Sequence, residues 1–164
     1  MALKPGRDIR SWDISYFMNE VAERGGIAFL STAGSGEALD QSTNLCTYAA
    51  SSGDIPVGLL MNDMVNIDQT RQHINWQKDE VQQGGKVTLC TRGWVVTNML
   101  SSGTIAGGNP AYADVDSATD GFNLTNIRHL GGLVARPWVG RFQTTADEDG
   151  YVKVYVDLPA QISE

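Results

Sequence analysis

The stretch Tyr151-Val152-Lys153-Val154-Tyr155-Val156-Asp157-Leu158 decides the fold class of this protein. Its valines and its leucine occupy alternate positions, and the tyrosines, the lysine and the aspartate occupy the positions between them. This period of two is typical of a β-strand with one buried and one solvated face. Asp149-Gly150, just before the stretch, is a strong hairpin signal, and Pro159 ends the strand. We therefore expect an antiparallel hairpin whose second strand lies at residues 151–158.

Short apolar runs between turn residues continue upstream of this hairpin. Alternation at Val87, Leu89 and Thr91 runs on into residues 94–97, with a bulge expected at Gly93. A tight turn is expected at 106–110, and further strands at 27–30, 45–50, 57–61, 111–113 and 138–144. Several short strands joined by glycine-rich turns predict a mainly β protein, a small antiparallel β-barrel or sandwich.

The N-terminal residues differ from the rest because their charges are dense and of mixed sign. Pro5-Gly6 disfavours a helix in this region, so residues 1–14 are predicted to form an extended arm. Residues 15–24 suit a short helix that stops at Gly25-Gly26. The alternative for these residues is that the extended arm simply continues.

The predicted organisation is an N-terminal arm or short helix at 1–26, followed by a β-domain at 27–164. Within that domain, the polar residues 62–85 are predicted to form a long, partly ordered connection. Loops of this length are usually functional or reach towards a partner.

Composition and charge exclude several classes of protein. Hydrophobic residues make up 41% of the 164 residues and charged residues 19%, which is enough apolar material for a core and too much for general disorder. The net charge of −7 and the pI near 4.7 argue against nucleic-acid binding, which needs clustered lysine and arginine. No secretory signal is predicted, because residues 1–8 contain no long apolar run. No membrane span is predicted, because the longest uncharged stretch, residues 93–113, is broken by glycine and proline.

Cysteine and histidine do not form a recognisable reactive or metal-binding motif. Cys46 and Cys90 lie in apolar runs, which favours small buried side chains, with a disulfide between them as the alternative. His73 and His129 lie at no metal-ligand spacing from each other or from the cysteines. A small hydrolase that pairs one cysteine with a histidine stays open as a minor hypothesis.

The acidic stretches do not match a calcium loop. Residues 116–121 and 147–150 resemble parts of one, but Ile127 and Val156 stand where the bidentate glutamate is required. The sequence also lacks a phosphate-binding loop. We therefore expect no metal and no cofactor, and a structural or binding protein rather than an enzyme.

A succession of motifs in the second half of the chain is more specific. It consists of KVTLCTRGWVVTN at 86–98, IAGGNPAY at 105–112, VGRF at 139–142 and DEDGYVKVYV at 147–156. This order resembles the head decoration, or capsid cement, proteins of tailed bacteriophages. PVGLLMND at 56–63 and IDQTRQHIN at 67–75 resemble podovirus-type members, so the resemblance spans roughly residues 55–158.

The resemblance implies a β-tulip-like domain that performs no catalysis. Such a protein would bind the major capsid protein on the outer surface of the virion, after synthesis in the host cytoplasm. It would staple neighbouring capsomers and stabilise the shell against internal DNA pressure. The resemblance also implies a homotrimer, with neither nucleic acid nor membrane as a partner.

Candidate contact residues for the capsid or another partner come from two segments. The arm offers apolar anchors and interface-type side chains at Arg7, Ile9, Arg10, Trp12 and Ile14. The polar connection offers Arg71, His73 and Trp76. The alternatives are a frayed terminus with Trp12 packed on its own core, and an ordinary solvated loop.

Two further tryptophans, Trp94 and Trp138, fall in predicted strands and are expected in the core.

The second functional hypothesis is a carbohydrate- or receptor-binding β-domain of a virion accessory protein. Exposed aromatic side chains on a shallow face would favour that hypothesis.

Overall fold

The computed structural model describes residues 10–31, 45–51, 53–65, 80–82, 84–101, 104–115, 121–128 and 136–158, with the backbone alone at 10–15, 65 and 80–82. Among these residues there are strands and turns and no helix. The strands are β1 (Arg10–Met18), β2 (Ile27–Leu30), β3 (Leu45–Thr47), β4 (Pro56–Leu60), β5 (Asp63–Val65), β6 (Glu80–Gln82), β7 (Lys86–Thr97), β8 (Pro110–Ala113), β9 (Leu124–Thr125), β10 (Trp138–Phe142) and β11 (Val152–Asp157).

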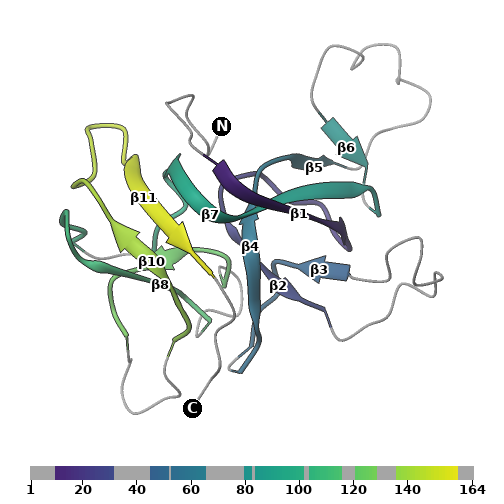
Figure 1. The fold of residues 1–164 in the computed structure, drawn as a ribbon, viewed down its shortest axis with the longest axis horizontal. Coiled ribbons are helices and arrows are strands. Elements are labelled where there is room, and N and C mark those ends of the chain that lie inside the picture. Colours follow the sequence, from purple (N-terminus) through teal and green to yellow (C-terminus); the bar gives the residue numbers. More distant parts are fainter. Residues whose placement is uncertain are drawn as a thin grey trace.

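Five strands close into a small barrel in the right-hand part of Figure 1. Their order is β1-β3-β2-β4-β7, and the ring closes because β7 pairs with β1 as well as with β4. β1 and β3 are parallel, and the other four neighbouring pairs of the ring are antiparallel. The prediction of a mainly β barrel is confirmed, with β1–β3 as a departure from a purely antiparallel arrangement.

The long strand β7 belongs to the barrel and also to an extension of the sheet. Gly93 pairs with Arg10 of β1 and with Val156 of β11, so these two strands lie on opposite edges of β7. From β11 the sheet continues through β10 and β8 to β9. Strands β11, β10 and β8 lie in the left-hand part of Figure 1. The first half of β7 therefore closes the barrel, and its second half carries the extension.

Two groups of buried residues fill the molecule. The barrel core receives side chains from all five barrel strands and consists of Met18, Ala22, Ala28, Cys46, Tyr48, Leu60, Met64, Val87 and Leu89. The sheet core lies between the barrel and the extension and consists of Ile27, Phe29, Leu59, Met61, Cys90, Val95, Ile105, Ala111, Ala113, Val115, Leu124, Val139, Phe142, Val152, Val154 and Val156.

Strand β2 separates these two cores, and its sequence reflects that position. Ile27 and Phe29 pack in the sheet core, whereas Ala28 packs in the barrel core. In the same way, β4 directs Leu59 to one core and Leu60 to the other. A strand that is buried on both faces has a continuous apolar run instead of an alternating one.

The predicted C-terminal hairpin is confirmed. Val152, Val154 and Val156 are buried, and the residues between them are half-buried on the opposite face. The turn before β11 places Gly150 at a φ of +80°, and its N–H donates to the carbonyl of Asp147 at 3.0 Å. Glycine occupies this left-handed conformation without the steric cost that a Cβ atom brings.

The short helix predicted over residues 15–24 is wrong. Residues 15–18 belong to β1, and they lie against the start of β7, with Phe17 paired to Lys86. Beyond β1, Ala22 forms an isolated antiparallel bridge with Met64. The local apolar spacing suited a helix, but pairing with β3 and β7 supplies long-range backbone hydrogen bonds that local propensity does not anticipate.

The polar connection predicted at 62–85 contains two short strands. β5 and β6 pair in parallel as a separate small sheet, and residues 66–79 between them lie outside the described residues.

The bulge expected at Gly93 is found next to this glycine, as a register irregularity in the pairing of β1 with β7 between Arg10 and Asp13. The ladder between β7 and β11 passes through Gly93 in regular register.

Candidate functional site

The predicted contact residues fall into two groups. Arg7, Ile9, Arg71, His73 and Trp76 lie outside the described residues, so their roles stay predictions. Arg10, Trp12 and Ile14 lie in β1, where they pair with Gly93, Arg92 and Leu89 of β7.

This pairing changes how the N-terminal segment is understood. From Arg10 onward the segment is an integral strand of the protein's own sheet, and Trp12 pairs with Arg92 of β7. The extended alternative for residues 15–18 is therefore the one observed, within a strand. The prediction of an arm that pairs with another molecule therefore applies only to the residues before Arg10, which lie outside the described residues.

A second candidate surface lies on the extension of the sheet, on the side opposite the sheet core. We call it the aromatic face. It consists of Arg92, Trp94 and Val96 of β7, Lys153, Tyr155 and Asp157 of β11, Trp138 and Arg141 of β10, and Pro110 and Tyr112 of β8. Their strand neighbours Val95, Val154, Phe142 and Ala111 are buried in the sheet core.

Side chains of β7 and β11 contact one another directly on this face. Arg92 Nε donates to Asp157 Oδ1 at 2.8 Å, and Nη2 lies at the same distance from that oxygen. The rings of Trp94 and Tyr155, which are cross-strand partners, have centroids 4.8 Å apart and a tilt of 51°. The Lys153 ammonium lies 5.2 Å from the centroid of the Trp94 ring. Such ring and cation–π contacts are each worth about 1 kcal/mol at a partly exposed site, so they hold the face in one arrangement.

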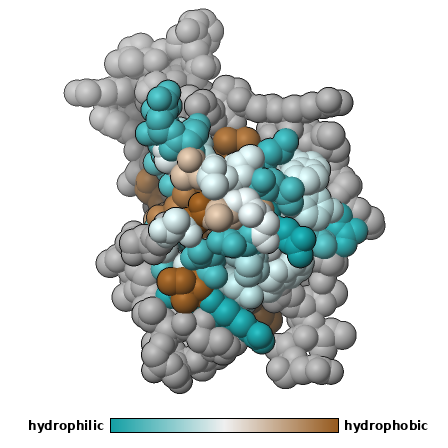
Figure 2. Space-filling model, turned by 90° about the vertical axis from the view of Figure 1, so that its left-hand side faces the viewer, coloured by the Kyte–Doolittle hydropathy of each residue, from teal (hydrophilic) through white to brown (hydrophobic). Residues whose placement is uncertain are grey.

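The aromatic face continues across β10 and β8. Arg141 is exposed and pairs with Tyr155 on one side and with Pro110 on the other. Trp138, 39% exposed, pairs with Tyr112. Figure 2 shows the side of the molecule that β8, β10 and β11 form, where hydrophilic and pale residues alternate and brown residues occur only as small separate spots. Tryptophan, tyrosine and arginine are the residue types enriched at the centres of protein interfaces.

The expectation that Trp94 and Trp138 lie in the core is wrong for Trp138, which is exposed. Trp94 is half-buried and lies on the outer side of the sheet, between the buried Gly93 and Val95. The outward position of Trp94 could have been predicted from the sequence, because this residue occupies an outward position in the alternation of β7. Trp138 is harder to place, because the ladder between β10 and β8 shifts register between Trp138 and Gly140.

Charge on the aromatic face differs in sign from that of the whole chain. The face carries the cations Arg92, Lys153 and Arg141 and the single anion Asp157, whereas the chain has a net charge of −7. Asp157 is already engaged by Arg92. The remaining positive charge of the face therefore comes from Arg141 and Lys153.

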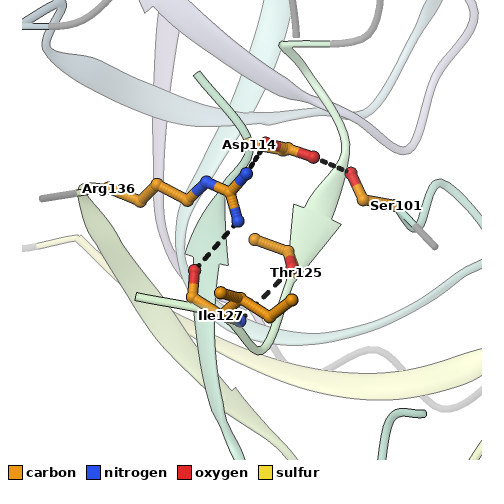
Figure 3. A network of polar contacts seen from close by, with 5 residues as sticks. All are labelled: Ser101, Asp114, Thr125, Ile127 and Arg136. Carbon is orange, nitrogen blue, oxygen red and sulfur yellow. Dashed lines mark hydrogen bonds and ion pairs between the residues drawn. The ribbon is translucent and has the colours of Figure 1, made fainter. Parts of the chain in front are cut away.

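A buried polar network lies at the other end of the extension (Figure 3). Arg136 Nη2 lies 2.5 Å from Asp114 Oδ1, and the two side chains are only 4% and 11% exposed. Arg136 Nη1 also donates to the carbonyl of Ile127 at 3.1 Å, and Ser101 donates its hydroxyl to Asp114 Oδ2. Thr125 Oγ1 accepts from the N–H of Ile127 at 3.3 Å. These contacts join the ends of β8 and β9 to the segment that enters β10, which is a structural role.

The two cysteines are free and buried, as expected, and do not form a disulfide. The Cys46 thiol lies 3.5 Å from the sulfur of Met18 in the barrel core. Burial, and secondarily the nearby Glu20 carboxylate, raises the pKa of Cys46 to about 12. Since the thiolate is the nucleophile, this environment opposes the role that a Cys46 hydrolase would require.

Other functional features were sought over the same parts of the chain. No group of three or more histidine, cysteine, aspartate or glutamate side chains is placed to hold a metal ion among the described residues. No helix within those residues is long and apolar enough to span a membrane. The acidic stretch at 147–150 is the exposed turn before β11, where the Asp147 carboxylate accepts from the backbone N–H groups of Asp149 and Tyr151.

Comparison with known proteins supplied no relative from which a role could be transferred: the sequence matches no protein-family model and no curated protein sequence.

Proposed function

We propose that this protein is a non-enzymatic decoration protein that binds the outer surface of a tailed-phage head and bridges neighbouring capsomers. The sequence resemblance motivates the proposal, and two of the motifs that carry it fall on the last two strands of the chain. The motif VGRF lies in β10, the Asp149-Gly150 turn follows it, and the last alternating stretch forms β11.

The observation that carries the proposal is how the N-terminal segment joins the sheet. Seven residue pairs connect β1 to β7, and β1 also pairs in parallel with β3. A pull on the residues before Arg10 that is directed along β1 would load the hydrogen bonds between β1 and β7 together, in shear, instead of one after another. A segment attached in this way can transmit force between a shell and a rigid domain, as a protein that resists internal pressure requires.

In this proposal, the major capsid protein is contacted by Arg7 and Ile9, and also by Arg10, Trp12 and Ile14, which lie in β1. The segment of residues 66–79, with Arg71, His73 and Trp76, is a second contact. Several copies bind the repeating subunits of one shell, so that weak single contacts add up to strong retention.

Removal of residues 1–9 tests the proposal without removing any residue of β1. The shortened protein should fold normally and lose most of its binding to emptied heads in a sedimentation assay. Ile9→Ala should weaken binding, whereas Ile55→Ala, which removes an apolar side chain exposed to 59% elsewhere, should not. Full occupancy by the shortened protein would contradict the assignment of the arm, and a few copies per virion by mass spectrometry would contradict decoration itself.

A carbohydrate- or receptor-binding domain is the second candidate, and the aromatic face favours it. Trp138 is 39% exposed beside the half-buried Tyr112, which is the kind of platform on which a sugar ring can stack. Trp94 is less suitable, because Lys153 and Tyr155 already contact its ring. Glycan-array binding that Trp138→Ala abolishes would establish this candidate, and absence of binding to any glycan would reject it.

A further inference from the structure

The aromatic face leaves positive charge without a matching anion. Arg141 is exposed, and among the described residues no acidic side chain forms an ion pair with it. Lys153 contacts the face of the Trp94 ring, which does not neutralise its charge. Around these cations lie Tyr155 and Trp138, which offer apolar area for a protein surface. The chemistry that fits the face is a rigid, acidic protein segment.

This protein itself presents such a segment. Asp147, Glu148 and Asp149 are exposed in the turn between β10 and β11. The turn is held firmly, because the Asp147 carboxylate accepts two backbone N–H groups, at 3.1 and 2.7 Å, and Gly150 supplies the left-handed residue. Figure 1 shows that this turn projects beyond the strands at the upper left. The exposed turn therefore has a defined shape.

We propose that the acidic turn of one copy docks on the aromatic face of a second copy. Glu148 of the turn faces Arg141 and Lys153 in this contact, and the rings around them are covered. The contact joins two different surfaces, so it is either made twice in a two-fold dimer, or repeated head to tail in a closed ring or a filament. This inference goes beyond the proposed function and does not depend on the capsid being the partner.

Charge explains why the contact is specific. Two copies that each carry a net charge of −7 repel one another in most orientations. The orientation that brings three exposed acidic side chains onto the cationic face replaces this repulsion with attraction. Charge pairs at the rim of an interface control the association rate and its salt dependence, so self-association should weaken as salt rises.

Light scattering after size-exclusion chromatography tests the inference on the full chain at several concentrations and salt levels. We expect oligomers in low salt, and about a tenfold or larger rise in the dissociation constant for Arg141→Glu and for Glu148→Arg. The double variant has the net charge of the natural chain, and it should regain most of the association because the charge pair is reversed. Lys86→Glu makes the same charge change at an exposed lysine at the other end of β7, and it should change association only slightly.

Each outcome of these measurements either supports the proposed contact between copies or overturns it. A protein that is monomeric at all concentrations overturns the inference, and so does an oligomer that Arg141→Glu affects no more than Lys86→Glu. Failure of the double variant to regain association overturns the acidic turn as the occupant of the face. Head binding is measured separately with the variant that lacks residues 1–9, so a negative result there concerns the proposed function alone.

Discussion

Replacement of Gly140 by alanine should destabilise this protein far more than the loss of a glycine usually does. Gly140 lies in β10 and pairs with Val156 of β11. A Cβ atom at Gly140 would lie 1.9 Å from the carbonyl oxygen of Tyr155. Real Cβ atoms essentially never come within 3.0 Å of such an atom, and backbone cannot rotate away as a side chain can. The two strands must therefore separate locally by about 1 Å or more to accept the methyl group.

The expected cost follows from this separation. Overpacking in a well-packed region costs about 1–3 kcal/mol. Displacing β11 also weakens the backbone hydrogen bonds between β10 and β11 around the Gly140–Val156 and Arg141–Tyr155 pairs. Each of these hydrogen bonds contributes about 1 kcal/mol to the free energy of unfolding. We therefore expect Gly140→Ala to lower the free energy of unfolding by about 3–5 kcal/mol, which is a large part of the stability of a typical domain.

Gly150→Ala is the matched control for this substitution. Nothing lies within 4 Å of a Cβ atom at Gly150, so the methyl group costs only the strain of a φ of +80°, about 1–2 kcal/mol. Urea unfolding followed by tryptophan fluorescence measures both variants against the natural chain. If Gly140→Ala proves no more destabilising than Gly150→Ala, the close approach of β10 to β11 is not as described, and the reasoning is refuted.

Two further predictions concern buried groups. Arg136→Met should lower the free energy of unfolding in urea by about 3–5 kcal/mol, because it leaves the Asp114 carboxylate buried without its cation. Adding Asp114→Ala should recover part of that loss. A cost below about 1 kcal/mol would show that the pair is solvated. The second prediction is that the free energy of unfolding falls as pH rises from 9 towards 12. The Cys46 thiol of the unfolded chain ionises near its ordinary pKa of 9.0, whereas the folded protein raises the pKa of this thiol to about 12, so the unfolded chain loses its proton first. Cys46→Ala should make this decline shallower in pH-dependent unfolding, and an unchanged slope would show that Cys46 does not contribute to it.

The candidate site could be anticipated only in part. The outward positions of Lys153, Tyr155 and Asp157 follow from the alternation of the last strand, and the structure bears them out. That Trp94 lies beside Tyr155 depends on the pairing of β7 with β11, which joins residues far apart in the chain. The exposure of Trp138 depends on a register shift, and no local pattern in the sequence encodes that shift.

The sequence by itself determined the local elements. Alternation of apolar and polar residues, glycine at turns and the Asp149-Gly150 signal act between near neighbours in the chain, so β2, β4, β7, β10 and β11 could be located from them. Each of these signals depends on a few consecutive residues, which is why it can be recognised without knowledge of the strand's neighbours.

Only the tertiary structure decided which strands are neighbours. Residues 15–18 have a spacing that suits a helix, and they become a strand because β3 and β7 offer unpaired backbone groups on either side. The same pairing closes the barrel and leaves β7 to carry the aromatic face on its second half. Hydrogen bonds between distant segments depend on the whole chain being folded, and a pattern read over a few residues contains no information about them.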